Sequence, residues 1–113
     1  MPTPYELNRA DVRRELKELI SMKKLTYAGQ KYASGCVIGL LLEKRGATKD
    51  DLIEWDNFEG DISTLIGKGL VMTDAAEWLW NLQMEHDDCC PNDWGNVSPR
   101  TAGRRFEFER KYG

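Results

Sequence analysis

The sequence predicts one mainly α-helical domain, built from four to five short helices and at most one small β-hairpin. Its 113 residues suit a single domain that spans residues 1–113. Hydrophobic residues make up 41% and charged residues 31%, a mixture typical of a globular protein. Apolar residues also recur at helical spacing between Gly- and Pro-containing breaks, which favours helices over strands.

The first helix is expected over residues 9–22. Asn8 is a good N-cap, and Leu7 and Val12 on either side of it have the spacing of a hydrophobic staple. Apolar side chains then recur at helical intervals, at Val12, Leu16, Leu19 and Ile20. Residues 23–35 lose this period, so we predict a loop or a short hairpin there.

A second helix is expected after Ser34, which we assign as its N-cap, with Cys36 in the first turn and Gly46 as the stop. Its apolar residues run almost all the way round, which is typical of a helix at the centre of a domain. Gly39 inside this helix costs up to about 1 kcal/mol relative to alanine. That cost indicates the close approach of a neighbouring element.

The middle of the chain predicts two brief helices. The first follows Thr48 and Asp51, which form an approximate capping box. The second ends near residues 67–69, where two glycines flank a lysine. Residues 70–72 then predict an extended linker or a short strand.

Two further helices are expected towards the C-terminus. Asp74 is assigned as the cap of a strong helix that runs to about Asp88. Residues 98–112 open with a Ser-Pro pair that suits a helix start, whereas residues 105–109 alternate as a half-buried strand would. We favour a helix for this last segment.

The formal net charge of −3 hides a strong segregation. Residues 43–93 carry thirteen acidic and four basic residues, whereas each flanking segment is basic by three charges. A nucleic-acid-binding domain usually has a basic surplus, so this balance argues against nucleic acid as the partner. A basic surface would have to combine arginines from both chain ends, for instance Arg13, Arg14, Arg104 and Arg105. The acidic segment is either a solvated face or a patch that engages a basic protein.

Cellular location can also be inferred from the composition. No apolar run approaches the roughly 20 residues of a membrane helix, so we expect no membrane partner. The chain opens without the pattern of a secretion signal. Three cysteines are an odd number and too few for a disulfide framework. We therefore expect a soluble protein of a reducing cytoplasm.

One candidate for chemistry is a thiol centre. Cys36 near a helix N-terminus would have a lowered thiol pKa, His86 is the sole histidine and would act as the base, and Asp87 would orient it. No Gly-rich nucleophile turn surrounds the cysteine. The favoured alternative is a Cys36 buried in the core and a His86 that ends its helix, so we lean against an enzyme and expect no cofactor.

A second candidate is a metal site. His86, Cys89 and Cys90 lie close together in the sequence, and Cys36 would complete a tetrahedral set of ligands. Adjacent cysteines seldom both bind one ion, and no Cys-x-x-Cys pair is present. We therefore expect no metal.

Tryptophans and acidic residues are the candidates for binding. Trp78 and Trp80 are two residues apart on one helix, so they cannot both face the same core. Trp80 is then either exposed or covered by the C-terminal tail, and we favour the covered position. Trp94 lies in a polar turn. Together with the Asp50-Asp51 pair, Trp80 and Trp94 are the residues that we expect to contact a partner.

The segment Gly29-Gln30-Lys31-Tyr32-Ala33-Ser34-Gly35-Cys36-Val37-Ile38-Gly39-Leu40-Leu41 resembles a pattern of small uncharacterised phage and prophage proteins. In those proteins a Gln- and Gly-containing loop precedes a Cys-x-x-Gly-x-Leu helix, and a later helix ends in Leu-x-x-Asn/His-Asp. Residues 82–87, with the sequence LQMEHD, are similar to that ending. The resemblance covers residues 9–88, whereas the Cys-Cys-Pro turn and the basic tail depart from it. It implies an accessory protein of a phage or mobile element in a bacterial cytoplasm, with no activity to transfer.

Taken together, the sequence predicts a small acidic accessory protein that binds, and thereby inhibits, a host macromolecule, with a protein as the expected partner. Two alternatives remain open at this point. One is a thiol-dependent hydrolase or transferase that uses Cys36 and His86. The other is nucleic-acid binding through the basic termini.

Overall fold

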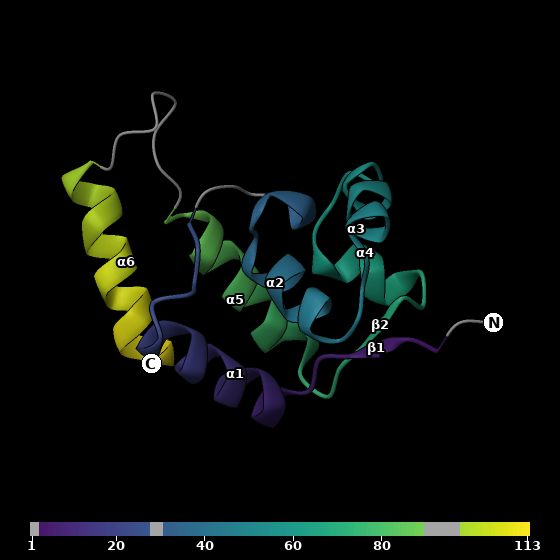
Figure 1. The fold of residues 1–113 in the computed structure, drawn as a ribbon, viewed down its shortest axis with the longest axis horizontal. Helices are drawn as coiled ribbons and strands as arrows, with labels where there is room; N and C mark the ends of the chain where they lie inside the picture. The colour runs from purple at the N-terminus through teal and green to yellow at the C-terminus, as the bar shows by residue number, and fades with distance from the viewer. Residues whose placement is uncertain (1–2, 28–30, 90–97) are drawn as a thin grey trace.

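The computed structural model describes residues 3–27, 31–89 and 98–113. About 64% of these described residues are helical, which confirms the predicted mainly α fold. Six α-helices, one 3₁₀ helix and a small parallel sheet make up the described part (Figure 1). In chain order the elements are β1 (Tyr5–Glu6), α1 (Arg9–Ser21), η1 (Tyr32–Ser34), α2 (Val37–Lys44), α3 (Lys49–Asp56), α4 (Ile62–Gly67), β2 (Val71–Met72), α5 (Ala76–Asp87) and α6 (Pro99–Tyr112).

Helix α1 begins and ends close to the predicted positions. Asn8 occupies the N-cap, and the staple residues Leu7 and Val12 are both fully buried. The Asn8 side chain makes no capping bond within its own helix. It accepts instead from the backbone N–H of Asp74, at 3.2 Å.

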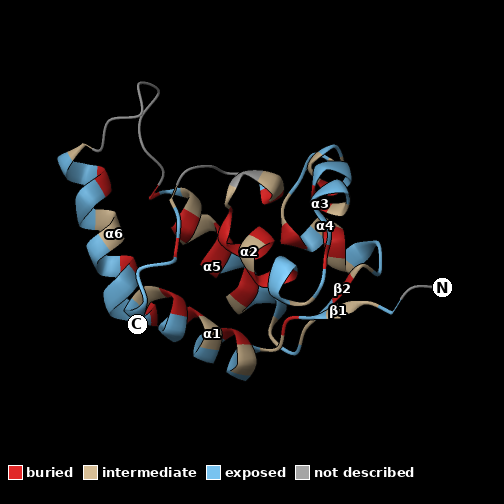
Figure 2. Cartoon of the chain, viewed as in Figure 1, coloured by how far each residue is buried: buried red, intermediate tan, exposed pale blue. Residues whose placement is uncertain are grey.

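Helix α2 lies at the centre of the fold, as its apolar sequence predicts, and its buried surface is conspicuous in Figure 2. The N-cap is Cys36 rather than Ser34, because Ser34 belongs to η1. Gly46 stops the helix in a left-handed conformation, with φ +97°. The two bonds of a Schellman motif are present, from Gly46 N to Glu43 O and from Ala47 N to Leu42 O.

The predicted close approach at Gly39 is confirmed. A Cβ atom at this position would lie only 2.0 Å from the backbone oxygen of Tyr32 in η1. Only glycine therefore lets α2 and η1 pack at this distance.

Helix α3 begins, and helix α4 ends, where the sequence predicts. Thr48 and Asp51 form a complete capping box, with bonds of 3.1 Å and 3.2 Å in the two directions. Asp61 is the N-cap of α4, and its side chain accepts from Ser63 N.

The small sheet differs from the predicted hairpin. Strand β1 pairs in parallel with β2, Tyr5 opposite Val71 and Glu6 opposite Met72. The partners are 66 residues apart, and a parallel pair cannot be joined by a tight turn. Within residues 70–72, Val71–Met72 form a strand, one of the two predicted alternatives.

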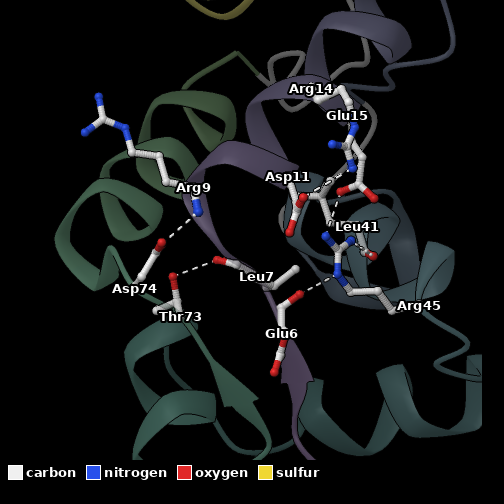
Figure 3. A network of polar contacts seen from close by, with 10 residues as sticks. All are labelled: Glu6, Leu7, Arg9, Asp11, Arg14, Glu15, Leu41, Arg45, Thr73 and Asp74. Carbon is white, nitrogen blue, oxygen red and sulfur yellow. Dashed lines mark hydrogen bonds and ion pairs between the residues drawn. The ribbon is translucent and has the colours of Figure 1, made fainter.

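Hydrogen bonds hold strand β1 and the beginning of α1 against the segment that follows β2 and against the end of α2 (Figure 3). Asp74, predicted to cap the next helix, instead accepts from Arg9 N at 2.9 Å and so caps α1 from outside. Ala75 is the N-cap of α5. Arg45 bridges the strand and α1, with bonds to Glu6 O at 2.6 Å and to Glu15 at 2.8 Å.

The C-terminal segment is a helix, so the alternative strand interpretation is wrong. Ser98 caps α6 and accepts from Thr101 N at 3.1 Å. The helix packs on α5 through its C-terminal half, where Tyr112 meets Trp78 edge-on at 6.0 Å between ring centres. No helix in the described ranges is long and apolar enough to cross a membrane.

Candidate functional site

The fold brings the predicted thiol and base to one junction between α2 and α5. The backbone N–H of Val37, next to Cys36, donates to Nδ1 of His86 at 3.4 Å. The other ring nitrogen of His86, Nε2, lies 2.7 Å from the carbonyl oxygen of Thr26. A carbonyl can only accept and a backbone N–H can only donate, so Nε2 carries the proton and the imidazole is neutral.

Burial keeps His86 in that neutral state. The side chain is fully buried, and desolvation lowers its pKa to about 4, with a smaller contribution from the positive charge of Arg105. Both nitrogens are engaged with backbone groups of separate segments. His86 therefore ties α5 to the start of α2 and to the segment around Thr26, and neither nitrogen is left for a proton transfer.

The thiol of Cys36 is not activated as a nucleophile. It is fully buried, and desolvation raises its pKa to about 12, with the charge of Asp87 adding to the effect. The amide of Gln83 lies 4.0 Å from its sulfur. A thiol of this kind packs as a small hydrophobic side chain and is a poor nucleophile.

Asp87 does not serve as the orienting partner of the imidazole, because both ring nitrogens of His86 bond to backbone groups. Burial, with a smaller contribution from the neighbouring charge of Asp88, raises the pKa of Asp87 to about 7. The geometry thus gives Cys36 and His86 structural roles, and it lends no support to a thiol enzyme.

The candidate metal ligands are engaged elsewhere where the structure describes them. Cys89 is buried and donates its thiol proton to Glu85 O at 3.3 Å. Within the described ranges no three His, Cys, Asp or Glu side chains gather around a common point. Cys90 lies outside the described residues.

An aromatic cluster closes the junction from the side of α6. Tyr27 stacks on the His86 ring at 5.2 Å, and Phe108 meets the same ring edge-on at 5.4 Å. Arg105 lies over the Tyr27 ring at 4.7 Å and also donates to Cys89 O. The sequence analysis missed Tyr27 and Phe108, because their approach to His86 depends on tertiary packing.

Trp80 is the candidate binding residue that the structure leaves at the surface. Its side chain is 38% exposed, and its indole N–H donates to Asp61 Oδ2 at 2.7 Å. The C-terminal tail covers Trp78 rather than Trp80, so the favoured expectation for Trp80 is wrong. Exposed Glu77 lies one helical turn before Trp80, and Glu59 lies two residues before Asp61. We call these four residues, Glu59, Asp61, Glu77 and Trp80, the Trp80 patch.

The other predicted contact residues are separate from this patch along the chain. Asp50 is exposed in the first turn of α3, at the end of that helix remote from the segment that leads to Asp61. Asp51 closes the capping box of α3 and so has a structural role. Trp94 lies outside the described residues.

The basic residues of the two chain ends are not gathered on one surface. Helices α1 and α6 meet near their C-terminal ends (Figure 1). Arg13 belongs to α1 and Arg104 to α6. Arg105 is already used against Tyr27, and Arg14 pairs with Asp11 at 3.2 Å.

No family model, no curated protein and no solved structure matches the chain.

Proposed function

We propose that this chain is a non-enzymatic binding protein that engages a basic protein surface through the Trp80 patch. The observation that carries the proposal is Trp80 itself. Its indole is held at the surface by a 2.7 Å bond to Asp61 rather than folded into the core. A large aromatic ring that is already fixed loses little conformational freedom when a partner covers it.

The surrounding charge indicates the chemistry of the partner. Three carboxylates belong to the patch: Asp61 bonds to the indole of Trp80, and exposed Glu59 and Glu77 lie within three residues of Asp61 and Trp80 in the sequence. An arginine of a partner can stack on the exposed indole and pair with a carboxylate at the same time. The segment that carries the patch is acidic as a whole, which would also speed the encounter with a basic protein.

In the setting that the sequence resemblance implies, the partner is a protein of a bacterial host and binding inhibits it. Neither Cys36 nor His86 takes part, since both are buried. The proposal therefore separates binding from the only residues in the chain that suggested thiol chemistry.

A peptide titration tests the chemistry of the patch directly. Peptides rich in arginine, in lysine or in glutamate are added to the labelled protein, and amide chemical shifts are followed by NMR. We expect the arginine peptide to shift the resonances of α4 and α5 around Trp80, and Trp80→Ala to weaken this response about tenfold. Met22→Ala, which removes an exposed apolar side chain at the end of α1, is the control.

Capture from bacterial lysates then tests the biological role. A specific protein should be retained by the wild-type chain and by Met22→Ala but lost with Trp80→Ala. Equal recovery by all three variants, or an arginine peptide that shifts resonances elsewhere, would refute the Trp80 patch as the binding surface.

A further inference from the structure

A groove of about 820 Å³ lies between the end of α5 and helix α6. Helix α6 contributes four basic side chains to its lining: Arg100, Arg104, Arg110 and Lys111. Phe106 also lines it and is 66% exposed, the most exposed large apolar side chain of the described chain. Three acidic residues, Glu85, Asp88 and Glu107, also line the groove, so basic residues exceed acidic ones by one. The groove thus combines an exposed apolar contact point with a small excess of positive charge.

Two of these basic side chains form ion pairs within the molecule. Lys111 pairs with Glu85 at 2.7 Å, and Arg110 pairs with Glu107. Arg104 differs, because its hydrogen bond goes to the backbone carbonyl of Asp88, at 3.4 Å, although the acidic residue Asp88 also lines the groove. Together with Arg100, it leaves the N-terminal half of α6 suited to carboxylates from outside.

Helix α3 has the complementary pattern on its outer face. Asp50, Ile53 and Glu54 are exposed. Ile53 and Glu54 follow Asp50 by three and four residues, so the three side chains share one surface of the helix. Ile53 is 50% exposed. The complete capping box at Thr48 holds this short helix in place, so its outer face is presented as a fixed surface.

These two surfaces lie at opposite ends of an elongated molecule. The chain measures 45 × 29 × 23 Å, and in Figure 1 the longest axis separates α6 at one end from α3 and α4 at the other. Counted over whole segments, α6 carries five basic and two acidic residues, whereas residues 43–69 carry seven acidic and four basic residues. The molecule is therefore polarised along its length.

We propose that two copies of this chain pair antiparallel, with α3 of each copy in the α5–α6 groove of the other. An elongated molecule with opposite charge at its ends is complementary to a second copy turned end for end. A two-fold pairing of this kind makes both contacts at once and closes, so it stops at a dimer. Each contact would join Ile53 to Phe106 and Glu54 to Arg104. The proposal does not rest on the Trp80 patch.

Light scattering and sedimentation of the full chain test the pairing. In about 20 mM salt we expect a dimer that dissociates to a monomer in about 500 mM salt, because exposed ion pairs are screened at high ionic strength. A monomer at every protein and salt concentration would overturn the proposal. Assemblies that grow beyond a dimer with concentration would overturn the closed arrangement.

Charge reversal then tests the two surfaces. Arg104→Glu and Glu54→Arg should each weaken the dimer by roughly tenfold or more, since each change introduces like charges at two symmetric contacts. The chain that carries both changes should pair again, because complementarity is restored with the signs exchanged. Arg13→Glu makes the same change of charge on α1 and should leave the dimer intact.

Circular dichroism of each variant establishes that the helices are retained. If Arg104→Glu keeps its helices and its dimer, the α5–α6 groove is not the contact surface. If the doubly changed chain stays monomeric while folded, Glu54 and Arg104 are not partners. Loss of arginine-peptide binding in Trp80→Ala with an unchanged dimer would separate this pairing from the proposed function.

Discussion

Trp80 and His86 lie on the same helix, α5, yet the fold uses them in opposite ways. His86 is fully buried, and both of its nitrogens bond to backbone groups of other segments. Trp80 is 38% exposed, and its single polar atom bonds to the cap of α4. His86, which could act as an acid or a base, is buried and has a structural role. Trp80, a large apolar side chain, is left partly at the surface.

The comparison shows why a residue type alone does not define a site. A histidine acts as a base only where a nitrogen remains available and its pKa lies near the working pH. The Cys36–His86 junction, by which we mean Cys36, Val37, Thr26 and His86, meets neither condition. The Trp80 patch meets the conditions of a binding surface, because its ring is partly exposed and is held by a hydrogen bond to the carboxylate of Asp61.

The largest expected effect on stability comes from adding a side chain at Gly39, where α2 contacts η1. Gly39→Ala would place a methyl group 2.0 Å from the Tyr32 carbonyl, and backbone atoms cannot yield as a flexible side chain can. We expect a loss of about 3 kcal/mol or more in the free energy of unfolding, measured with urea. Gly103→Ala in α6 meets no atom within 4 Å, and should instead stabilise the protein by up to about 1 kcal/mol. Equal effects of the two changes would mean that η1 does not pack against Gly39.

A second pair of variants contrasts the two residues of α5. His86→Leu leaves the Val37 N–H and the Thr26 carbonyl without their partner, which should destabilise the fold by about 3 kcal/mol. Trp80→Phe removes only the bond to Asp61, with an expected loss of about 1 kcal/mol. Urea unfolding at neutral pH measures both. A smaller loss for His86→Leu than for Trp80→Phe would reverse the roles assigned to the two residues.

The pH dependence of stability sharpens the same contrast. The pKa of His86 is about 4 in the fold and ordinarily 6.5, so between these values the unfolded chain binds the proton and the folded chain does not. Stability from His86 is therefore present at neutral pH and falls with acidification, by about 2 kcal/mol between pH 7 and pH 5.

Asp87 acts in the opposite sense and must be removed from the measurement. Its pKa is raised to about 7, so its folded form gains relative stability as the pH falls and the carboxyl is protonated. We therefore compare Asp87→Asn with the chain that also carries His86→Gln. The pH slope should be present in the first and absent in the second, and His86 itself should titrate near pH 4 by NMR. A titration near 6.5 would contradict its burial.

Much of the local structure can be predicted from the sequence, because the signals involved are local. The staple at Leu7 and Val12, the capping box at Thr48 and the stop at Gly46 each depend on residues a few positions apart. Gly39 could be recognised as a packing position because glycine is unfavourable inside a helix. These predictions all hold in the structure.

Apart from the N-cap of α2, which is Cys36 rather than Ser34, the features that were missed depend on residues distant in the sequence. Strands β1 and β2 are two residues each, too short to show any alternation. Asp74 has the sequence pattern of a local cap, and only the tertiary arrangement turns it towards Arg9. The surroundings of His86 come from α2, α6 and the segment around Thr26, so no spacing in the sequence could reveal them.

The reactivity of Cys36 tests most directly whether the Cys36–His86 junction is structural. The measurement is labelling by iodoacetamide between pH 5 and 9, in a chain with Cys89→Ser and Cys90→Ser. Because the thiol is fully buried and its pKa is raised to about 12, we expect no labelling until denaturant is added. Rapid labelling of the folded protein, with a midpoint well below the ordinary thiol value of roughly 8.5, would contradict the structural role and restore Cys36 as a nucleophile.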